Sequence, residues 1–182
     1  MAFRHEIEDF GPFYERTYPA AFRTALGICG EPSLAADVTQ EAYVAAYRQR
    51  DRFRGQAPAG AWLQRIVVNA ALSGLRRRKV RWTEPLEAGR HDRAGGEGAD
   101  RLDALALRAA LEVLPAKQRA AVVLRYYHDL DYATIARILD TSPGNVGALL
   151  SRAVQRLRLE FDGDGPAAAA PLPATREAGH GR

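Results

Sequence analysis

The chain has 182 residues and a mass of 20.0 kDa, which is room for one ordinary domain or two small ones. Its 47% of hydrophobic and 26% of charged residues exclude a chain that is disordered throughout. The longest apolar stretches hold a few residues, which excludes a membrane-spanning segment, and the single cysteine excludes an internal disulfide framework. The first ten residues lack the apolar core of a secretory signal, so we expect a cytoplasmic protein.

The net charge of +4 is distributed unevenly along the chain. Residues 48–81 hold 10 basic and 1 acidic side chains, whereas residues 1–47 have a net charge of −4 and residues 82–103 a net charge of −3. A concentrated positive stretch attracts polyanions, and nucleic acid is the first candidate. The alternative is a solvated helix surface without a partner.

The first segment, residues 6–81, is predicted to form three or four helices. Pro19 is expected to start a new turn, Gly30 to end that element, and Ser33 to cap the next helix with its hydroxyl. The first apolar residues recur at steps of three and four, which is the period of a helix face: Ile7, Phe10, Tyr14 and Tyr18.

A basic loop, residues 52–58, is predicted to precede the last helix of this segment, residues 59–79. Leu63 and Val67 belong to one face of that helix. A second face carries larger and polar side chains at steps of three and four: Trp62, Arg65, Asn69, Ser73 and Arg76. The helix ends in the letters RRRKVR, which place five positive charges in six residues.

Two stretches interrupt the helical pattern. Residues 82–101 are acidic and glycine-rich and are predicted to form a flexible linker. Residues 161–182 are rich in alanine, proline and glycine and are predicted to be a disordered tail. Neither remaining segment shows convincing strand-like alternation, so we predict an all-α protein of two small helical domains, residues 6–81 and 102–160.

The second domain is predicted to contain a helix-turn-helix. A helix is expected to stop at Leu114, before a proline, and a second helix to cover residues 116–127. Asp131 is expected to cap a short helix, and Ser142 to cap the last one. A short helix, a tight turn and a longer helix describe this motif. The inward-facing residues of the last helix are expected to be Val146, Leu150, Ala153 and Leu157.

Three stretches together resemble a known family. They are AADVTQEAYVAAYR at residues 35–48, RFRGQAPAGAWLQRIVVNAALSGLRRR at residues 52–78 and LPAKQRAAVVLRYYHDLDYATIARILDTSPGNV at residues 114–146. In this order they resemble the extracytoplasmic-function (ECF) sigma factors of the sigma-70 family. The resemblance implies two helical domains on a tether and no enzymatic activity. The implied partners are core RNA polymerase, promoter DNA and an anti-sigma factor.

The resemblance also implies roles for individual residues of the first domain. The first stretch would bind core polymerase through Asp37, Gln40, Glu41 and Val44. The second would read the −10 promoter element, where an extruded base needs stacking and hydrogen bonds, and the strand needs cations. Trp62 and Phe53 are also consistent with a place in the core, which we favour for Trp62. The −10 candidates are Arg52, Phe53, Arg54, Trp62, Arg65, Asn69, Arg76, Arg77, Arg78 and Lys79.

The third stretch would read the −35 element. The last helix would enter the major groove, and cations of the preceding helix would contact phosphate. The −35 candidates are Lys117, Arg119, Arg125, Pro143, Gly144, Asn145, Ser151 and Arg152. The chain departs from the family here, because Gly147, Leu149 and Val154 stand at positions that are commonly basic. We therefore expect a weaker grip on the −35 duplex and a flatter dependence on salt.

Two alternatives to a sigma factor remain open at this point. A sigma-like decoy would bind an anti-sigma factor and no DNA, and a helix-turn-helix regulator would act without core polymerase. An enzyme fits least, because the four histidines are scattered and Cys29 has no partner at metal-ligand spacing. No phosphate-binding glycine loop is present in the sequence either. We expect no metal and no cofactor.

Overall fold

A computed structural model of the chain describes residues 7–55, 57–81 and 99–162. All regular elements in these ranges are helices, which confirms the all-α prediction. We call residues 7–81 the first half of the molecule and residues 99–162 the second half. Most of the predicted linker and of the predicted tail lies outside the described residues.

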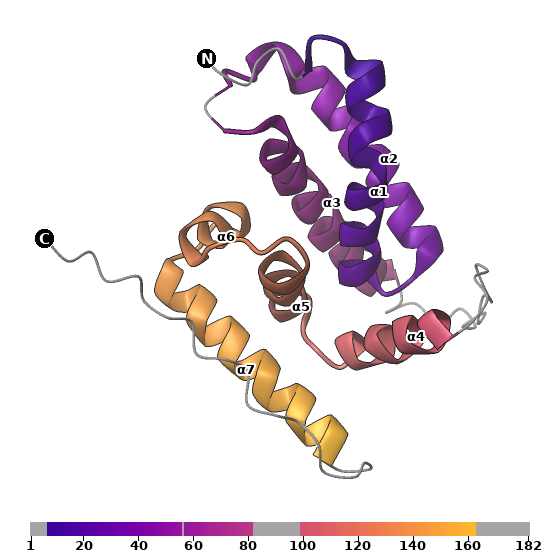
Figure 1. Ribbon diagram of the computed structural model, residues 1–182, viewed down its shortest axis with the longest axis vertical. Helices are drawn as coiled ribbons and strands as arrows, with labels where there is room; N and C mark the ends of the chain where they lie inside the picture. Colours follow the sequence, from indigo (N-terminus) through magenta and orange to yellow (C-terminus); the bar gives the residue numbers. More distant parts are fainter. Residues whose placement is uncertain (1–6, 56, 82–98, 163–182) are drawn as a thin grey trace, which may run out of the picture.

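The first half is built from three long helices that pack against one another: α1 (Phe10–Cys29), α2 (Pro32–Gln49) and α3 (Ala59–Arg81) (Figure 1). A short 3-10 helix, η2 (Arg50–Arg52), follows α2. Gly74 lets α3 approach α2, because a Cβ atom there would lie 2.9 Å from Cγ2 of Val38. The largest fully buried side chains of this core are Phe13, Ile28, Val38, Leu63, Val67 and Val68.

Two expected boundaries of the first half are wrong. Pro19 lies inside α1 and starts no new element. An internal proline costs roughly 3 kcal/mol, and the long buried face on both sides of Pro19 offsets that cost. Ser33 does not cap α2, because the helix already begins at Pro32 and the Ser33 hydroxyl donates to a carboxylate oxygen of Glu31.

The second half contains α4 (Ala99–Glu112), α5 (Ala116–Val122), α6 (Tyr132–Leu139) and α7 (Pro143–Asp162). The predicted helix over residues 116–127 ends instead in a π-helical turn, η3 (Val123–Tyr127). Both predicted caps are confirmed. Asp131 accepts from the backbone N–H of Thr134 at 2.8 Å, and the Ser142 hydroxyl accepts from that of Asn145 at 3.2 Å.

The two halves pack directly on each other, which their expected separation on a tether did not predict. Helix α1 contacts α5 and η3, and α3 contacts α5 and α6 (Figure 1). One hydrophobic cluster runs across the junction and includes Ile28 from the first half, and Leu124 and Ile135 from the second. We call this packing of the halves the closed arrangement.

Arg119 is the buried cation at this junction, with 9% of the residue exposed. Its Nη1 donates to the backbone oxygen of Ile28 at 2.9 Å, across the junction. Its Nη2 donates to the backbone oxygens of Glu112 at 3.1 Å and Leu114 at 3.0 Å. These acceptors lie at the C-terminal ends of α1 and α4, where backbone oxygens lack helical partners and the helix dipole is negative. Arg119 was a candidate, with Lys117, for contact with DNA phosphate; in the closed arrangement its guanidinium is buried and engaged with backbone oxygens instead.

Gly30 makes room for this guanidinium. It ends α1 in the left-handed conformation, with φ of 78°, and its N–H donates to the backbone oxygen of Leu26 at 2.8 Å. A Cβ atom on Gly30 would lie 2.9 Å from Oε1 of Glu112 and 3.3 Å from Nη1 of Arg119. Glycine therefore satisfies both the backbone conformation and the close approach of the second half.

Arg119→Met should lower the free energy of unfolding by about 3 kcal/mol, because it leaves three backbone oxygens without their donor. The measurement is urea unfolding followed by circular dichroism. Lys117→Met on the same helix is the matched control, since Lys117 is exposed and its loss should change stability by less than about 0.5 kcal/mol. Equal effects of the two substitutions would contradict the role given to Arg119.

His128 makes the stability of the molecule depend on pH. Its Nε2 lies 2.6 Å from the Thr24 hydroxyl, which itself donates to the backbone oxygen of Ala20, so His128 is the donor across the junction. Burial, and secondarily the charge of Arg23, lower the pKa of His128 below its ordinary 6.5. The folded state thus favours the neutral ring, and stability is lost as pH falls below about 6.5.

We expect the unfolding free energy of the unmodified chain to fall more between pH 7.5 and 5.5 than that of His128→Gln. Glutamine keeps an N–H donor for Thr24 but does not titrate. Urea unfolding of both proteins at the two pH values provides the comparison. Parallel losses in the two proteins would show that His128 has no part in the pH dependence.

Candidate polymerase groove and nucleic-acid interface

Helix α2 carries the four residues predicted to bind core polymerase on one exposed face. Asp37, Gln40, Glu41 and Val44 line a shallow groove together with Ala45 and Arg48. Their spacing of three and four residues places them on one side of the helix, and the opposite side is buried against α1 and α3. Val44 is 49% exposed, so it offers an apolar contact among polar neighbours, which suits pairing with another helix.

The basic end of α3 divides into two parts. Nη2 of Arg77 forms an ion pair with Oε2 of Glu41 at 2.7 Å, and Arg78 pairs with Glu31. These two arginines therefore hold α3 to α2 and the loop before it. Arg76 and Lys79 are exposed, and Arg76 donates to the Ser73 hydroxyl at 3.0 Å. The four consecutive −10 candidates at the end of α3 therefore differ: Arg77 and Arg78 form ion pairs within the protein, and Arg76 and Lys79 are exposed.

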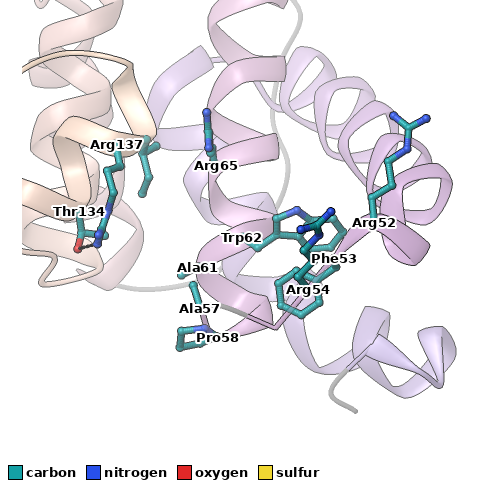
Figure 2. A pocket seen from close by; sticks show the side chains of 11 residues that line it. Arg52, Phe53, Arg54, Ala57, Pro58, Ala61, Trp62, Arg65, Thr134 and Arg137 are labelled. Atoms are coloured by element: carbon teal, nitrogen blue, oxygen red, sulfur yellow. Dashed lines mark hydrogen bonds between the residues drawn. The ribbon is translucent and has the colours of Figure 1, made fainter. Parts of the chain in front are cut away.

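Five −10 candidates meet at a cavity of about 610 Å³ beside the start of α3: Arg52, Phe53, Arg54, Trp62 and Arg65 (Figure 2). The rings of Phe53 and Trp62 pack with centroids 5.0 Å apart. Phe53 is buried, whereas Trp62 is half-buried, so Trp62 both packs on the core and forms part of the cavity wall. Asn69 is exposed on α3, one helical turn beyond Arg65.

Helix α6 forms the far side of this cavity with Thr134, Arg137 and Ile138, none of which was predicted as a site residue. Arg137 is exposed and donates to the Thr134 hydroxyl at 2.9 Å. Its position opposite the apolar face of a short helix is typical of a solvated arginine. No local pattern indicates that it faces a loop from the other half of the chain.

The predicted −35 candidates are dispersed. Asn145 lies exposed in the first turn of α7 beside Pro143 and Gly144, and its Nδ2 donates to the Thr141 hydroxyl at 2.7 Å. Ser151 and Arg152 are exposed further along α7. These residues keep an outward position that can meet DNA.

Two of the three cations predicted to contact phosphate from the helix before the turn are engaged within the protein. Lys117 is exposed, but Arg119 is buried at the junction as described above. Nη1 of Arg125 donates to Oδ1 of Asp129 at 3.3 Å and to the backbone oxygen of Leu130 at 3.1 Å. Arg125 therefore orders the turn that leads into α6.

Leu149 is neutral for a structural reason. It is 8% exposed and belongs to the hydrophobic core, so a basic side chain at this position would be buried. A Cβ atom on Gly147, by contrast, would meet only Cε2 of Tyr132, at an ordinary 3.6 Å. The two departures from the family's basic positions thus differ: one serves packing, and the other leaves space for a side chain.

Cys29 is buried, and burial raises the pKa of its thiol to about 11, which keeps it protonated. In the described ranges there is no cluster of three or more histidine, cysteine, aspartate or glutamate side chains able to hold a metal ion. None of the helices within residues 7–55, 57–81 and 99–162 has the length and apolar content that crossing a membrane requires.

Comparison with known families and proteins gives consistent matches. The model of sigma-70 region 2 matches residues 13–81, and the model of sigma-70 region 4 matches residues 104–157. The ECF RNA polymerase sigma factor SigM of Mycobacterium tuberculosis is 40% identical over 123 residues, which cover 68% of this chain and 62% of SigM. The chain therefore spans less than two thirds of that relative. The RNA polymerase sigma-E factor of Streptomyces avermitilis is 32% identical over 159 residues, covering 86% of this chain and 87% of that protein.

Two solved structures are similar to the whole arrangement of helices. The sigma factor RpoE in complex with the anti-sigma factor NepR from Bartonella quintana aligns with a TM-score of 0.68 and 26% identity. That alignment covers 85% of this chain and 99% of the other. CnrH, in complex with the cytosolic domain of CnrY, shares the fold with a TM-score of 0.64 and 24% identity, over 86% of this chain and 89% of the other.

Gly147→Lys and Leu149→Arg should have opposite effects on the second half. Gly147→Lys should tighten binding to promoter duplex about threefold or more at low salt, because it adds a cation at a position where a side chain fits. It also replaces a glycine inside the helix with a residue of higher helix propensity. Leu149→Arg should cost about 3 kcal/mol of stability, because it buries a charge. Fluorescence anisotropy with a labelled duplex and urea unfolding measure the two effects. Stable folding of Leu149→Arg would contradict the packing role of Leu149.

Proposed function

The chain belongs to the ECF sigma factors of the sigma-70 family, and we propose that it binds core RNA polymerase, directs it to specific promoters and starts transcription there. The observation that supports this most is that α2 and α3, which pack against each other, carry two different exposed surfaces. The exposed groove of α2 belongs to the unit of three packed helices in the first half, as does the wall of the arginine-lined cavity that α3 and its preceding loop form. A protein that holds polymerase with one surface can then present a DNA strand to the other.

The groove of α2 would receive a helical segment of the polymerase. Val44 would contribute apolar contact, while Asp37 and Gln40 would contribute polar contacts at the rim. The ion pair of Glu41 with Arg77 joins this groove to the basic end of α3. Polymerase contact with Glu41 would therefore be transmitted to the surface that meets DNA.

The −10 strand would be read along the exposed face of α3. Arg65 and Arg54 provide cations for its backbone, and the exposed part of Trp62 provides a surface on which an extruded base can stack. Asn69, one turn further on, can both donate to and accept from a base edge. Phe53 would act from beneath by supporting Trp62, since it is buried.

The −35 duplex would be held mainly by the N-terminal half of α7. Asn145, Ser151 and Arg152 are the outward-facing side chains for base edges and phosphate, with Lys117 as a further cation. Because Arg119 and Arg125 are already engaged, few cations are left for phosphate, and we expect a shallow dependence of duplex binding on salt.

We further propose that the protein acts in the bacterial cytoplasm, where promoter DNA and RNA polymerase are, and that an anti-sigma factor restrains it. The support for a restraining partner is that the similar sigma factor RpoE is seen in complex with the anti-sigma factor NepR.

Two substitutions should separate polymerase binding from promoter reading. Val44→Asp should weaken retention of core polymerase about tenfold, because it places a charge on the apolar centre of the groove. Arg65→Ala should leave that retention unchanged and lower the yield of transcript about tenfold, because it removes a strand contact. Pull-down of purified core polymerase and run-off transcription on the protein's own upstream region measure the two properties.

Val113→Asp is the control for Val44→Asp, since Val113 is 36% exposed and does not line the groove. A folded protein that does not retain core polymerase would overturn the proposed function and favour a decoy or a regulator that acts alone. If Arg65→Ala weakens retention of core polymerase as much as Val44→Asp does, polymerase binding and promoter reading are not divided between the two surfaces.

A further inference from the structure

The cavity beside α3 is completed by the second half of the molecule. Its lining comes from the loop after α2, from the first two turns of α3 and from α6 (Figure 2). Figure 2 shows Thr134 and Arg137 on one side and Trp62, Phe53 and Arg54 on the other, with Arg65 between them. Because α6 belongs to the second half, this composite lining exists only in the closed arrangement. Reading a DNA strand with α3 needs no residue of α6.

Positive charge gathers at this cavity without an acidic partner in its lining. Arg52, Arg54, Arg65 and Arg137 line it, and among the residues that the structure describes no aspartate or glutamate does. Within the described residues, the side chains of the first three make no ion pair and no hydrogen bond, and Arg137 donates to Thr134. Asp131 caps α6 and offsets part of the charge of Arg137, but it does not line the cavity. The closed arrangement therefore brings like charges together across the junction, which costs energy unless an anion lies between them.

Apart from these arginines and Thr134, the lining is apolar and includes the indole ring of Trp62. Trp62 is half-buried beside Phe53, and Pro58, Ala61 and Ile138 complete the apolar surface. A planar aromatic ring can stack on an exposed indole face. The volume of about 610 Å³ lies within the range of sites that hold small ligands. The lining thus combines a place for an aromatic ring with cations for phosphate.

We propose that this cavity is a binding site for a free nucleotide, with the base against Trp62 and the phosphates between Arg65 and Arg137. Arginine suits this task because its planar guanidinium donates two parallel hydrogen bonds to phosphate oxygens. A ligand held by both halves stabilises the closed arrangement, and this stabilisation grows with the logarithm of the ligand concentration relative to its Kd. The inference goes beyond the proposed function, since it concerns the protein without polymerase or promoter.

Trp62 offers a direct probe of the site. The chain has two tryptophans, Trp62 and Trp82, so Trp82→Phe leaves Trp62 as the sole indole. We expect ADP to quench the fluorescence of this protein saturably, excited at 295 nm in low salt, and to raise its Tm. Adenosine and inorganic pyrophosphate should each bind at least about tenfold more weakly, because each supplies one of the two features that the lining matches.

Arg137 decides whether the site spans both halves. Arg137→Ala in the Trp82→Phe background should weaken ADP binding about tenfold, since it removes one charge-assisted contact. Arg156→Ala is the matched control, because it removes an exposed arginine of α7 that does not line the cavity. Circular dichroism confirms that both variants fold.

Two results would overturn the proposal. The first is the absence of saturable quenching and of a rise in Tm with ADP. The second is equal ADP affinity of Arg137→Ala and Arg156→Ala, which would show that α3 and its loop bind nucleotides alone, as they would bind a unit of a DNA strand. Neither result bears on retention of core polymerase, so a failure here is distinct from a failure of the proposed function.

Discussion

A buried guanidinium is the interaction on which the closed arrangement depends. Desolvation of an arginine is costly unless its donors are satisfied, and Arg119 satisfies Nη1 and Nη2 with backbone oxygens from two helix ends. The last turn of α1 contains no basic residue, so α5 supplies the cation that this helix end lacks. One side chain therefore orders α4 against α5 and joins both to α1, and Gly30 is the residue that permits its approach.

The junction has two ends of opposite electrostatic character. Near α1 the two halves are held together by an apolar cluster and by two hydrogen bonds, one from Arg23 to Tyr127 and one between His128 and Thr24. Near the start of α3 it is electropositive, because arginines of the loop and of α6 face a common cavity. Apolar burial depends little on salt, whereas repulsion between exposed cations is screened by it. Ionic strength and anions therefore act more strongly on the end near α3 than on the end near α1.

Short-range features of the fold were predictable from the sequence. Asp131 and Ser142 cap their helices because an N-cap depends on residues within one turn, and the inward face of α7 follows from the helical period alone. The groove of α2 is predictable for the same reason, since its four residues share one face of one helix. The boundary predicted at Pro19 was wrong because the energetic cost of a proline inside a helix is offset by the tertiary burial of α1, which the local sequence does not show.

Long-range features were not predictable, and two arginines show why. Arg119 and Arg137 lie on neighbouring helices. Arg119 has no acidic residue three or four positions away, and Arg137 has only Asp140, which is the C-cap residue of α6. The first is buried and donates to a backbone oxygen of α1, 91 residues away in sequence, and the second is exposed at a cavity shared with α3. Their roles follow from how the second half is seated on the first, which residue type and spacing do not encode. Leu149 is a further example. From the sequence, a leucine at a position that is commonly basic in the family suggests a lost DNA contact, but its burial shows that it serves packing. Charge in this chain acquires its function from which cations the packing buries and which it leaves facing a shared space.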